Sequence, residues 1–180
     1  HYPLRRQRQM CIRDREKDEA KHFRQLEKVL QDYEIYTCFL KSVKGVGPAM
    51  AGVILSEIDI HKSRYASSIW KYAGLDVAKD GRGRSRKKEH LVETEYTDKD
   101  GKAKKKMGIS FNPFLKTKLV GVLGSSFLRA GTKDNPYRAI YDGYKERLEN
   151  SPDHTEKSKG HRHNMAIRYM VKMFIIDLYK

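Results

Sequence analysis

Two glycines and a proline in the segment Lys44-Gly45-Val46-Gly47-Pro48-Ala49 could give this chain a site for anions. Glycine has no Cβ, so the backbone amides around Gly45 and Gly47 can approach a ligand closely. Pro48 suits the first position of a helix, where the missing N–H would have no intrahelical partner anyway. A helix that begins there directs its free N–H groups and its positive end toward a phosphate. The residues predicted to contact phosphate here are Lys44, Gly45, Val46, Gly47 and Ala49.

Apolar residues on both sides of the glycines predict the helices that must hold them. The pattern apolar-x-x-apolar-x-Gly-apolar-Gly, followed by an apolar run, is the helix-hairpin-helix signature. The residues that form it are Leu40, Val43, Val46, Ala51, Ile54 and Leu55. The alternative is an ordinary turn between two packed helices, because short motifs often match by chance.

The charge balance agrees with a polyanionic partner. The 180 residues include 38 Lys and Arg against 23 Asp and Glu, a formal net charge of +15. Such an excess attracts nucleic acid and releases its counterions, although an acidic protein or a membrane surface would also be attracted. No run reaches the roughly 18 apolar residues of a membrane span. Cys11 and Cys38 form neither a CxxC pair nor a disulfide pattern, so we expect a cytoplasmic protein.

The most basic part of the chain lies between residues 79 and 108. Residues 79–88 cannot bury themselves and are expected to form a loop that is disordered until it meets a polyanion. Residues 91–97 predict a strand, Asp100-Gly101 a hairpin turn and residues 102–107 a basic returning strand. A lysine-coated hairpin would reach phosphates, but lysines also protect exposed strand edges. The cations predicted to contact nucleic acid here are Arg82, Arg84, Arg86, Lys87, Lys88, Lys104, Lys105 and Lys106.

The rest of the sequence predicts a mainly α fold with this small inserted β-hairpin. Asn112-Pro113 and Asn135-Pro136 each combine a capping side chain with a proline suited to the first helical position. Residues 161–178 read as a core helix. His154, His161 and His163 lack a further ligand at metal-binding spacing, so no metal site is expected in this chain.

A long charged helix is expected before the hairpin, so we divide the chain at residue 38. Residues 1–38 form the basic N-terminus and helix, and residues 39–180 form the DNA-binding domain with its insert at 79–108. The apolar seam on the helix is narrow: Phe23, Leu26, Leu30 and Tyr33. This seam could pack on its own domain or pair with a second copy as a coiled coil. Because residue 1 is His rather than Met, two interpretations are open: a processed product, or the C-terminal piece of a longer protein.

The order of these motifs resembles the C-terminal Tnp domain of the Piv-type DNA invertases and the insertion-sequence transposases grouped with them. The resemblance rests on Gly45-Val46-Gly47-Pro48-Ala49, then Trp70-Lys71-Tyr72-Ala73-Gly74-Leu75, a Gly/Arg/Ser-rich loop and the Asn112 to Leu119 helix. It covers roughly residues 24 to 130. Members of that family resemble two-part recombinases that carry an N-terminal RuvC-like domain with metal-binding acidic residues.

The resemblance implies DNA as the partner, with a guide RNA in related transposases. It also implies a serine nucleophile a few residues after the Gly-Leu pair, where this chain has Asp80-Gly81, so Ser85 is the nearest catalytic candidate. Ser85 would need a base and cations beside it, and otherwise belongs to a polar loop. Magnesium is expected only through a RuvC-like domain, and Lys116 is a further candidate contact to nucleic acid.

Two other functions fit the same residues. A non-catalytic DNA- or RNA-binding module needs only the hairpin and the basic segments. A DNA-repair glycosylase also uses a helix-hairpin-helix, but it requires an acidic residue in a pocket for an extruded base. Asp59 is the acidic residue after the hairpin that could take that role.

Overall fold

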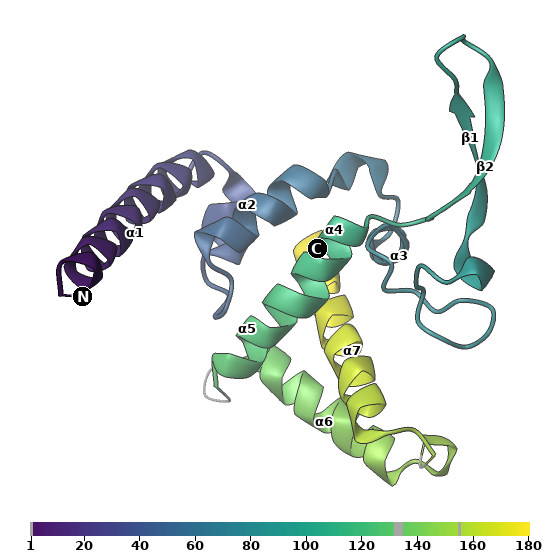
Figure 1. Cartoon of the computed structure of the whole chain (residues 1–180). Helices are drawn as coiled ribbons and strands as arrows, with labels where there is room; N and C mark the ends of the chain where they lie inside the picture. The colour runs from purple at the N-terminus through teal and green to yellow at the C-terminus, as the bar shows by residue number, and fades with distance from the viewer. Residues whose placement is uncertain (1, 132–134, 155) are drawn as a thin grey trace.

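The computed structural model describes residues 2–131, 135–154 and 156–180 and is mainly helical, with one antiparallel two-stranded sheet (Figure 1). This confirms the predicted fold class. The helices are α1 (Tyr2–Leu30), α2 (Pro48–Glu57), α3 (Ala66–Tyr72), α4 (Pro113–Lys116), α5 (Gly124–Arg129), α6 (Pro136–Asn150) and α7 (Lys159–Tyr179), and the strands are β1 (Val92–Thr97) and β2 (Ala103–Gly108). Over the described ranges, no helix combines the length and the apolar character that crossing a membrane requires.

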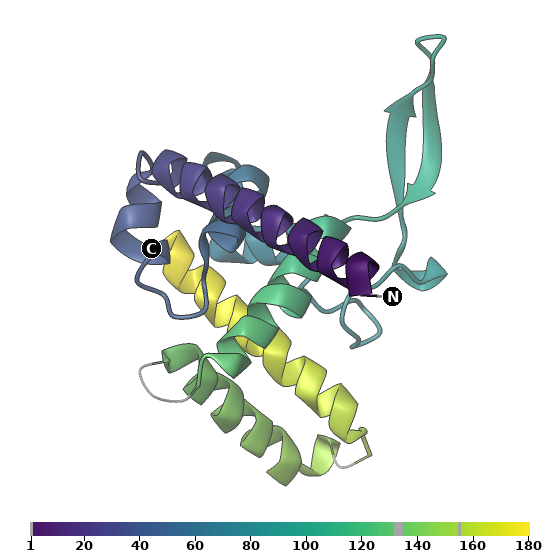
Figure 2. The same ribbon diagram turned by 60° about the vertical axis from the view of Figure 1, so that its left-hand side comes forward.

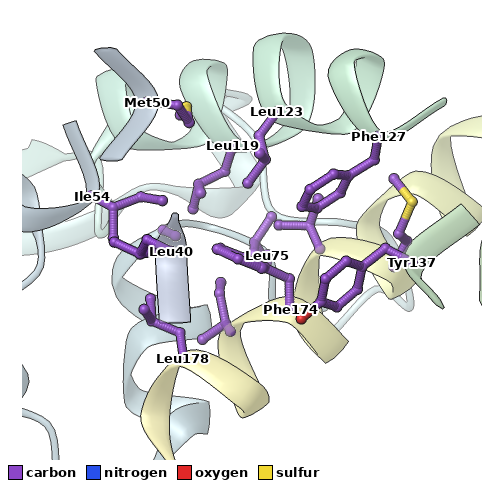
Figure 3. Close-up of a cluster of buried hydrophobic side chains, with 14 of the residues drawn as sticks. Leu40, Met50, Ile54, Leu75, Leu119, Leu123, Phe127, Tyr137, Phe174 and Leu178 are labelled. Carbon is purple, nitrogen blue, oxygen red and sulfur yellow. The ribbon is translucent and has the colours of Figure 1, made fainter. Parts of the chain in front are cut away.

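The core of the molecule surrounds α7. Met170, Val171 and Phe174 on this helix are fully buried, and α7 packs against α3, α5 and α6. Phe174 meets the stacked rings of Phe127 and Tyr137 edge-on, each with a centroid separation of 5.5 Å (Figure 3). Burying one such side chain stabilises the fold by about 1.5–3 kcal/mol. This cluster therefore fixes α5, α6 and α7 relative to one another.

Side-chain caps start three of these helices, and the caps at Asn112 and Asn135 are as the sequence predicts, whereas Ser158 was not singled out. The Asn112 side chain accepts a hydrogen bond from the Leu115 amide at 3.0 Å, and Asn135 accepts one from Arg138 at 3.4 Å. Ser158 caps α7 by accepting from the His161 amide at 3.2 Å. Because each bond joins residues three apart, these helix starts could be predicted locally.

Between α4 and α5 the helix widens to a π-helical form over Thr117–Leu123. Four core residues in this region follow at strict four-residue spacing and are all fully buried: Leu115, Leu119, Leu123 and Phe127. Four residues turn through slightly more than one turn of an α-helix and slightly less than one turn of a π-helix. Alternating the two forms keeps the four side chains on one face of a helix that the sequence predicts to be regular.

Helix α1 packs on α2, and its buried and half-buried residues lie in its last turns (Figures 1 and 2). Residues 4–25 are exposed, whereas Leu26 is half-buried and Leu30 is buried. Leu26 packs over α2 at Gly52, where an added Cβ would lie 3.6 Å from its Cδ1. The predicted seam thus packs on its own domain at its end, while Phe23 and Tyr33 stay exposed. Pairing of α1 with a second copy stays a prediction.

Candidate functional site

Gly45 holds the glycine hairpin in place through its backbone. Its φ of +101° lies in the region that favours glycine. An added Cβ would lie 2.9 Å from Cδ1 of Phe127, and the Ser126 hydroxyl donates a hydrogen bond to the Gly45 carbonyl at 2.8 Å. The glycine hairpin is therefore held against α5, and the role of Gly45 is structural.

Gly47 has a different environment, at the exposed start of α2. It is the N-cap residue, with φ of −91°, and provides no side chain to bond the first N–H groups of the helix. An added Cβ at Gly47 would meet nothing within 4 Å, and both Gly47 and Ala49 are exposed. The start of α2 is thus open to solvent in a form that can accept an anion. The segment before the turn, Tyr36–Leu40, is a short π-helix whose Tyr36 and Leu40 are buried.

The loop that follows α3 is fastened, in contrast to the unstructured loop expected from its composition. Gly74 ends α3 with φ of +64°, and Val77 pairs with Gly83 in an antiparallel bridge. The Arg84 guanidinium bonds to both carboxylate oxygens of Asp76, with Nη2 at 2.8 Å from Oδ2. Lys116 reaches into the same region and donates to the Arg84 carbonyl. Arg84 and Lys116, both predicted to contact nucleic acid, therefore hold the loop in this structure.

Ser85 lies at the end of a hydrogen-bonded chain of three side chains. Its Oγ is 2.8 Å from Nδ1 of His90, and Nε2 of His90 is 3.0 Å from Oδ2 of Asp80. The His90 side chain is buried, with 4 % of the residue exposed. Nucleophile, imidazole and carboxylate in this order form the arrangement that activates a serine hydroxyl.

Backbone amides determine the direction of the protons in this chain. The Ser85 N–H donates to Nδ1 of His90 at 2.9 Å, so Nδ1 is an acceptor and the neutral ring carries its proton on Nε2. Nε2 then donates to Asp80. Because Nδ1 carries no proton, the Ser85 hydroxyl is the donor in its 2.8 Å contact with Nδ1, and it shares this acceptor with the Ser85 N–H. The Lys87 N–H donates to Ser85 Oγ at 3.3 Å. Hydrogen bonds from the Arg82 amide and from His90 hold the pKa of Asp80 below its usual value, so the carboxylate stays ionised.

A metal ion does not fit this cluster. One ligand atom each from Asp80, Glu89 and His90 lies within 4.8 Å of the others. However, Nε2 of His90 bears the proton donated to Asp80 and has no lone pair for a cation, and Mg²⁺ prefers oxygen ligands in octahedral geometry. Of the histidines considered from the sequence, His163 Nδ1 pairs with the Tyr141 hydroxyl at 2.5 Å and His154 Nδ1 with Lys157 Nζ at 2.8 Å.

A pocket opens beside Ser85 and His90, and we name it the loop–α7 pocket. It holds about 470 Å³ between residues 82–90 and the first turns of α7. Its charged lining residues are Arg82 and Lys87 on the loop and Arg168 on α7. A larger pocket of about 840 Å³ shares these three cations and is also lined by Asp80 and Glu156. A hydroxyl with a base beside it, in a cationic pocket, can attack a phosphate.

Ser85, Arg82 and Lys87 were predicted from the sequence, whereas His90, its partner Asp80 and Arg168 were not. The available signal for His90 and Asp80 was that each lies five residues from Ser85. Arg168 had none, because it reaches the loop only through the packing of α7.

The β-hairpin carries its lysines as predicted, but they have local partners. Lys104 pairs with Asp98, Lys105 Nζ lies 3.1 Å from Glu93, and Lys106 Nζ lies 4.7 Å from the centre of the Tyr96 ring. Exposed ion pairs contribute only about 0–1 kcal/mol, so these lysines can exchange their partners for phosphates. Arg86 and Lys88 of the loop are exposed.

Residues 38–94 match the family model described as Transposase IS116/IS110/IS902 family. This segment contains the glycine hairpin, α2, α3 and the Asp80–Ser85–His90 cluster, and the match confirms the predicted resemblance to a transposase C-terminal domain. Searches of the curated proteins and of the solved structures gave no significant match to the chain.

Proposed function

With a transposase-related role as the premise, we propose that this chain is the nucleic-acid-binding domain of a transposase and contributes Ser85 to strand cleavage and transfer. The observation that carries this proposal is the hydrogen-bonded chain from Asp80 through His90 to the Ser85 hydroxyl, beside a pocket lined by cations. A serine that attacks phosphorus needs both a base for its proton and cations around the phosphate.

The reaction can be written for these residues. Ser85 Oγ attacks the phosphorus of a DNA phosphodiester, its proton passes to Nδ1 of His90, and a bond from Oγ to phosphorus forms. The ester bond to the departing strand breaks, and the leaving oxygen takes the proton from Nδ1. In the transfer step a hydroxyl of another strand gives its proton to Nδ1 of His90 and attacks the phosphorus joined to Ser85. The bond from phosphorus to Ser85 Oγ breaks, and Oγ takes the proton back from Nδ1. Magnesium belongs, in this proposal, to a RuvC-like domain.

Two further surfaces would contact the phosphates of the DNA backbone. The exposed start of α2 at Gly47 and Ala49 offers amides to one phosphate. The cations on the 79–88 loop and on the β-hairpin add attraction that does not depend on DNA sequence, since phosphate contacts position a protein without reading bases. The exposed members of this set are Arg82, Arg86, Lys87, Lys88, Lys104, Lys105 and Lys106.

Salt-dependent binding tests these phosphate contacts. Affinity for duplex DNA, followed by fluorescence anisotropy, is expected to fall steeply as salt rises. Gly47→Val places a side chain before the amides and is expected to weaken binding about tenfold, the loss of roughly one charge-assisted hydrogen bond. Gly143→Val, at an exposed glycine of α6 with open space around it, is the matched control. If the folded Gly47→Val protein binds duplex DNA as tightly as the wild type, the glycine hairpin is not part of the interface. If the wild type binds an RNA hairpin more tightly than duplex DNA, RNA is the partner.

A non-catalytic binding module is the second candidate. The Ser85 amide also donates to His90 Nδ1 at 2.9 Å, so His90 could serve only to fasten the loop. Under this alternative Ser85→Ala leaves strand transfer by the complete transposase unchanged. A glycosylase has less support, because Asp59 is exposed, accepts from the His61 amide at 3.1 Å and pairs with Lys62 at 3.0 Å.

A further inference from the structure

Arg168 is a partly buried cation without an anion of its own. Among the described residues, no hydrogen bond or ion pair joins its guanidinium to another side chain. The nearby carboxylate of Asp76 already bonds to Arg84 through both oxygens. Burial lowers the pKa of Arg168, and the charge of Asp76 opposes this only in part. Holding a charged group in this place costs free energy that an anion would recover.

The guanidinium of Arg168 can occupy its position only because loop residue 83 is glycine. A Cβ built on Gly83 would lie 1.2 Å from Nη1 of Arg168, so no other residue type fits while the guanidinium lies there. Arg168 thus passes against the loop backbone and lines the pocket that Ser85 also lines.

Further cations accumulate around the same carboxylate. Burial lowers the pKa of Lys116 to about 8, with the charge of Arg168 as the next cause. Burial also lowers the pKa of Lys172, and Arg168 lowers it further while Asp76 raises it. The charge of Asp76 acts on all four of these cations: Arg84, Lys116, Arg168 and Lys172. The part of the protein beside the loop–α7 pocket therefore carries more half-buried positive charge than negative charge.

We propose that the loop–α7 pocket binds a phosphodiester group of the nucleic-acid backbone, with the Arg168 guanidinium as its main contact and Arg82 and Lys87 beside it. A guanidinium presents parallel N–H groups that match two phosphate oxygens. A volume of about 470 Å³ is sufficient for the phosphate and an attached nucleoside. The proposal rests on the proposed function and adds to it α7, which lies outside the matched residues 38–94.

Two substitutions remove the guanidinium from this position by different routes. Arg168→Gln deletes the charge. Gly83→Ala keeps the arginine but places a methyl group where Nη1 lies, and the flexible end of Arg168 can move aside without unfolding the protein. Arg13→Gln, on the exposed part of α1, removes the same charge elsewhere and is the matched control.

The probes are thymidylyl-thymidine, the shortest DNA phosphodiester, and inorganic phosphate, titrated into the chain and followed by calorimetry and by the NMR signals of arginine side chains. We expect saturable binding of the dinucleotide, weakened about tenfold by Arg168→Gln and by Gly83→Ala and unchanged by Arg13→Gln. The Arg168 side-chain signal is assigned by its absence from the Arg168→Gln spectrum. In the wild-type protein this signal is expected to shift when the dinucleotide is added.

Three results would overturn the proposal: no saturable binding of the dinucleotide, wild-type affinity in both folded variants, or binding of inorganic phosphate alone. The proposed function can fail separately, because the grip at Gly47 is measured with duplex DNA and this pocket with a dinucleotide. A pocket that binds the dinucleotide, in a protein whose duplex affinity does not depend on Gly47, would retain this inference and reject the hairpin grip.

Discussion

Individual residues in the candidate site divide into those that hold the backbone and those that face a ligand. Gly45 combines a positive φ with close packing on Phe127, whereas Gly47 has an ordinary φ and open space. The two glycines of one motif thus have different tasks. Similarly, Arg84 is taken up by Asp76, while Arg82 and Lys87 line the pocket.

Exchanging each glycine for alanine separates these tasks. Gly45→Ala is expected to lower the free energy of unfolding by about 1–3 kcal/mol, because alanine is strained at positive φ. Gly47→Ala should change it by less than about 1 kcal/mol. Urea denaturation followed by circular dichroism measures both. Equal losses in the two variants would contradict the different roles assigned to these glycines.

Activation of Ser85 can be measured without knowing the DNA target. A phosphonofluoridate probe reacts with an activated serine: the Oγ–P bond forms, fluoride leaves and the hydroxyl proton passes to Nδ1 of His90. We expect labelling of Ser85, about 100-fold slower in His90→Gln because a positioned general base contributes at least that much. Mass spectrometry gives the site and the rate.

Ser56→Ala is the control for this experiment, because Ser56 is exposed on α2 and its hydroxyl donates to the Val53 carbonyl at 3.2 Å. This variant should be labelled like the wild type. Labelling of Ser85 at the same rate in His90→Gln would show that His90 only holds the loop.

At the scale of elements, α7 and the 113–129 helix form the support of the site. Lys116 extends from α4 to the Arg84 carbonyl, and Arg168 extends from α7 to Gly83, so the loop is held between them. Asn112 joins three elements: it caps α4, and its amide donates to Glu57 at 2.6 Å and to the Tyr72 hydroxyl at 3.1 Å. Helix α1 and the β-hairpin extend from this support (Figure 1).

Removal of the first part of α1 tests how independent this helix is. A chain that begins at Phe23 should unfold within about 0.5 kcal/mol of the full chain, because residues 4–22 are exposed. Leu30→Ala in the full chain should cost about 2–5 kcal/mol, because Leu30 is buried. Urea denaturation at several protein concentrations measures both. A large, concentration-dependent loss on truncation would instead indicate that α1 pairs with a second copy.

At the scale of the whole molecule, excess positive charge must be accommodated within the fold. Lys116 is charged in the folded protein only below about pH 8, while its ordinary pKa is 10.5. Between these values the unfolded chain binds more protons than the folded chain, so the contribution of Lys116 to stability rises with pH. Tyr137 acts in the opposite direction above pH 10, because burial raises its pKa.

The pH dependence of folding should show this effect. From pH 7 to 9.5 the wild-type protein is expected to gain about 1 kcal/mol of unfolding free energy relative to Lys116→Met, after allowance for solvent screening of a half-exposed amine. Urea denaturation in buffers without phosphate or sulfate measures the two curves. A constant difference between them would mean that the Lys116 amine keeps its ordinary protonation.

The sequence by itself determined the features that depend on near neighbours. Asn112, Asn135 and the Asp100-Gly101 turn act within a few residues, so helix starts and the β-hairpin could be predicted, and the net charge is additive along the chain. The segment containing the glycine hairpin could be recognised as transposase-like because its motifs follow in order.

Only the tertiary structure decided which polar residues meet. His90 reaches Ser85 because the loop closes on itself through Val77, Gly83 and the Arg84–Asp76 pair, and Arg168 reaches the loop because α7 packs beside α3. Lys116 and Arg84 were predicted to contact nucleic acid, but their actual partners depend on distances across the fold. Electrostatic energy depends on separation and burial, and neither is written in residue type or spacing.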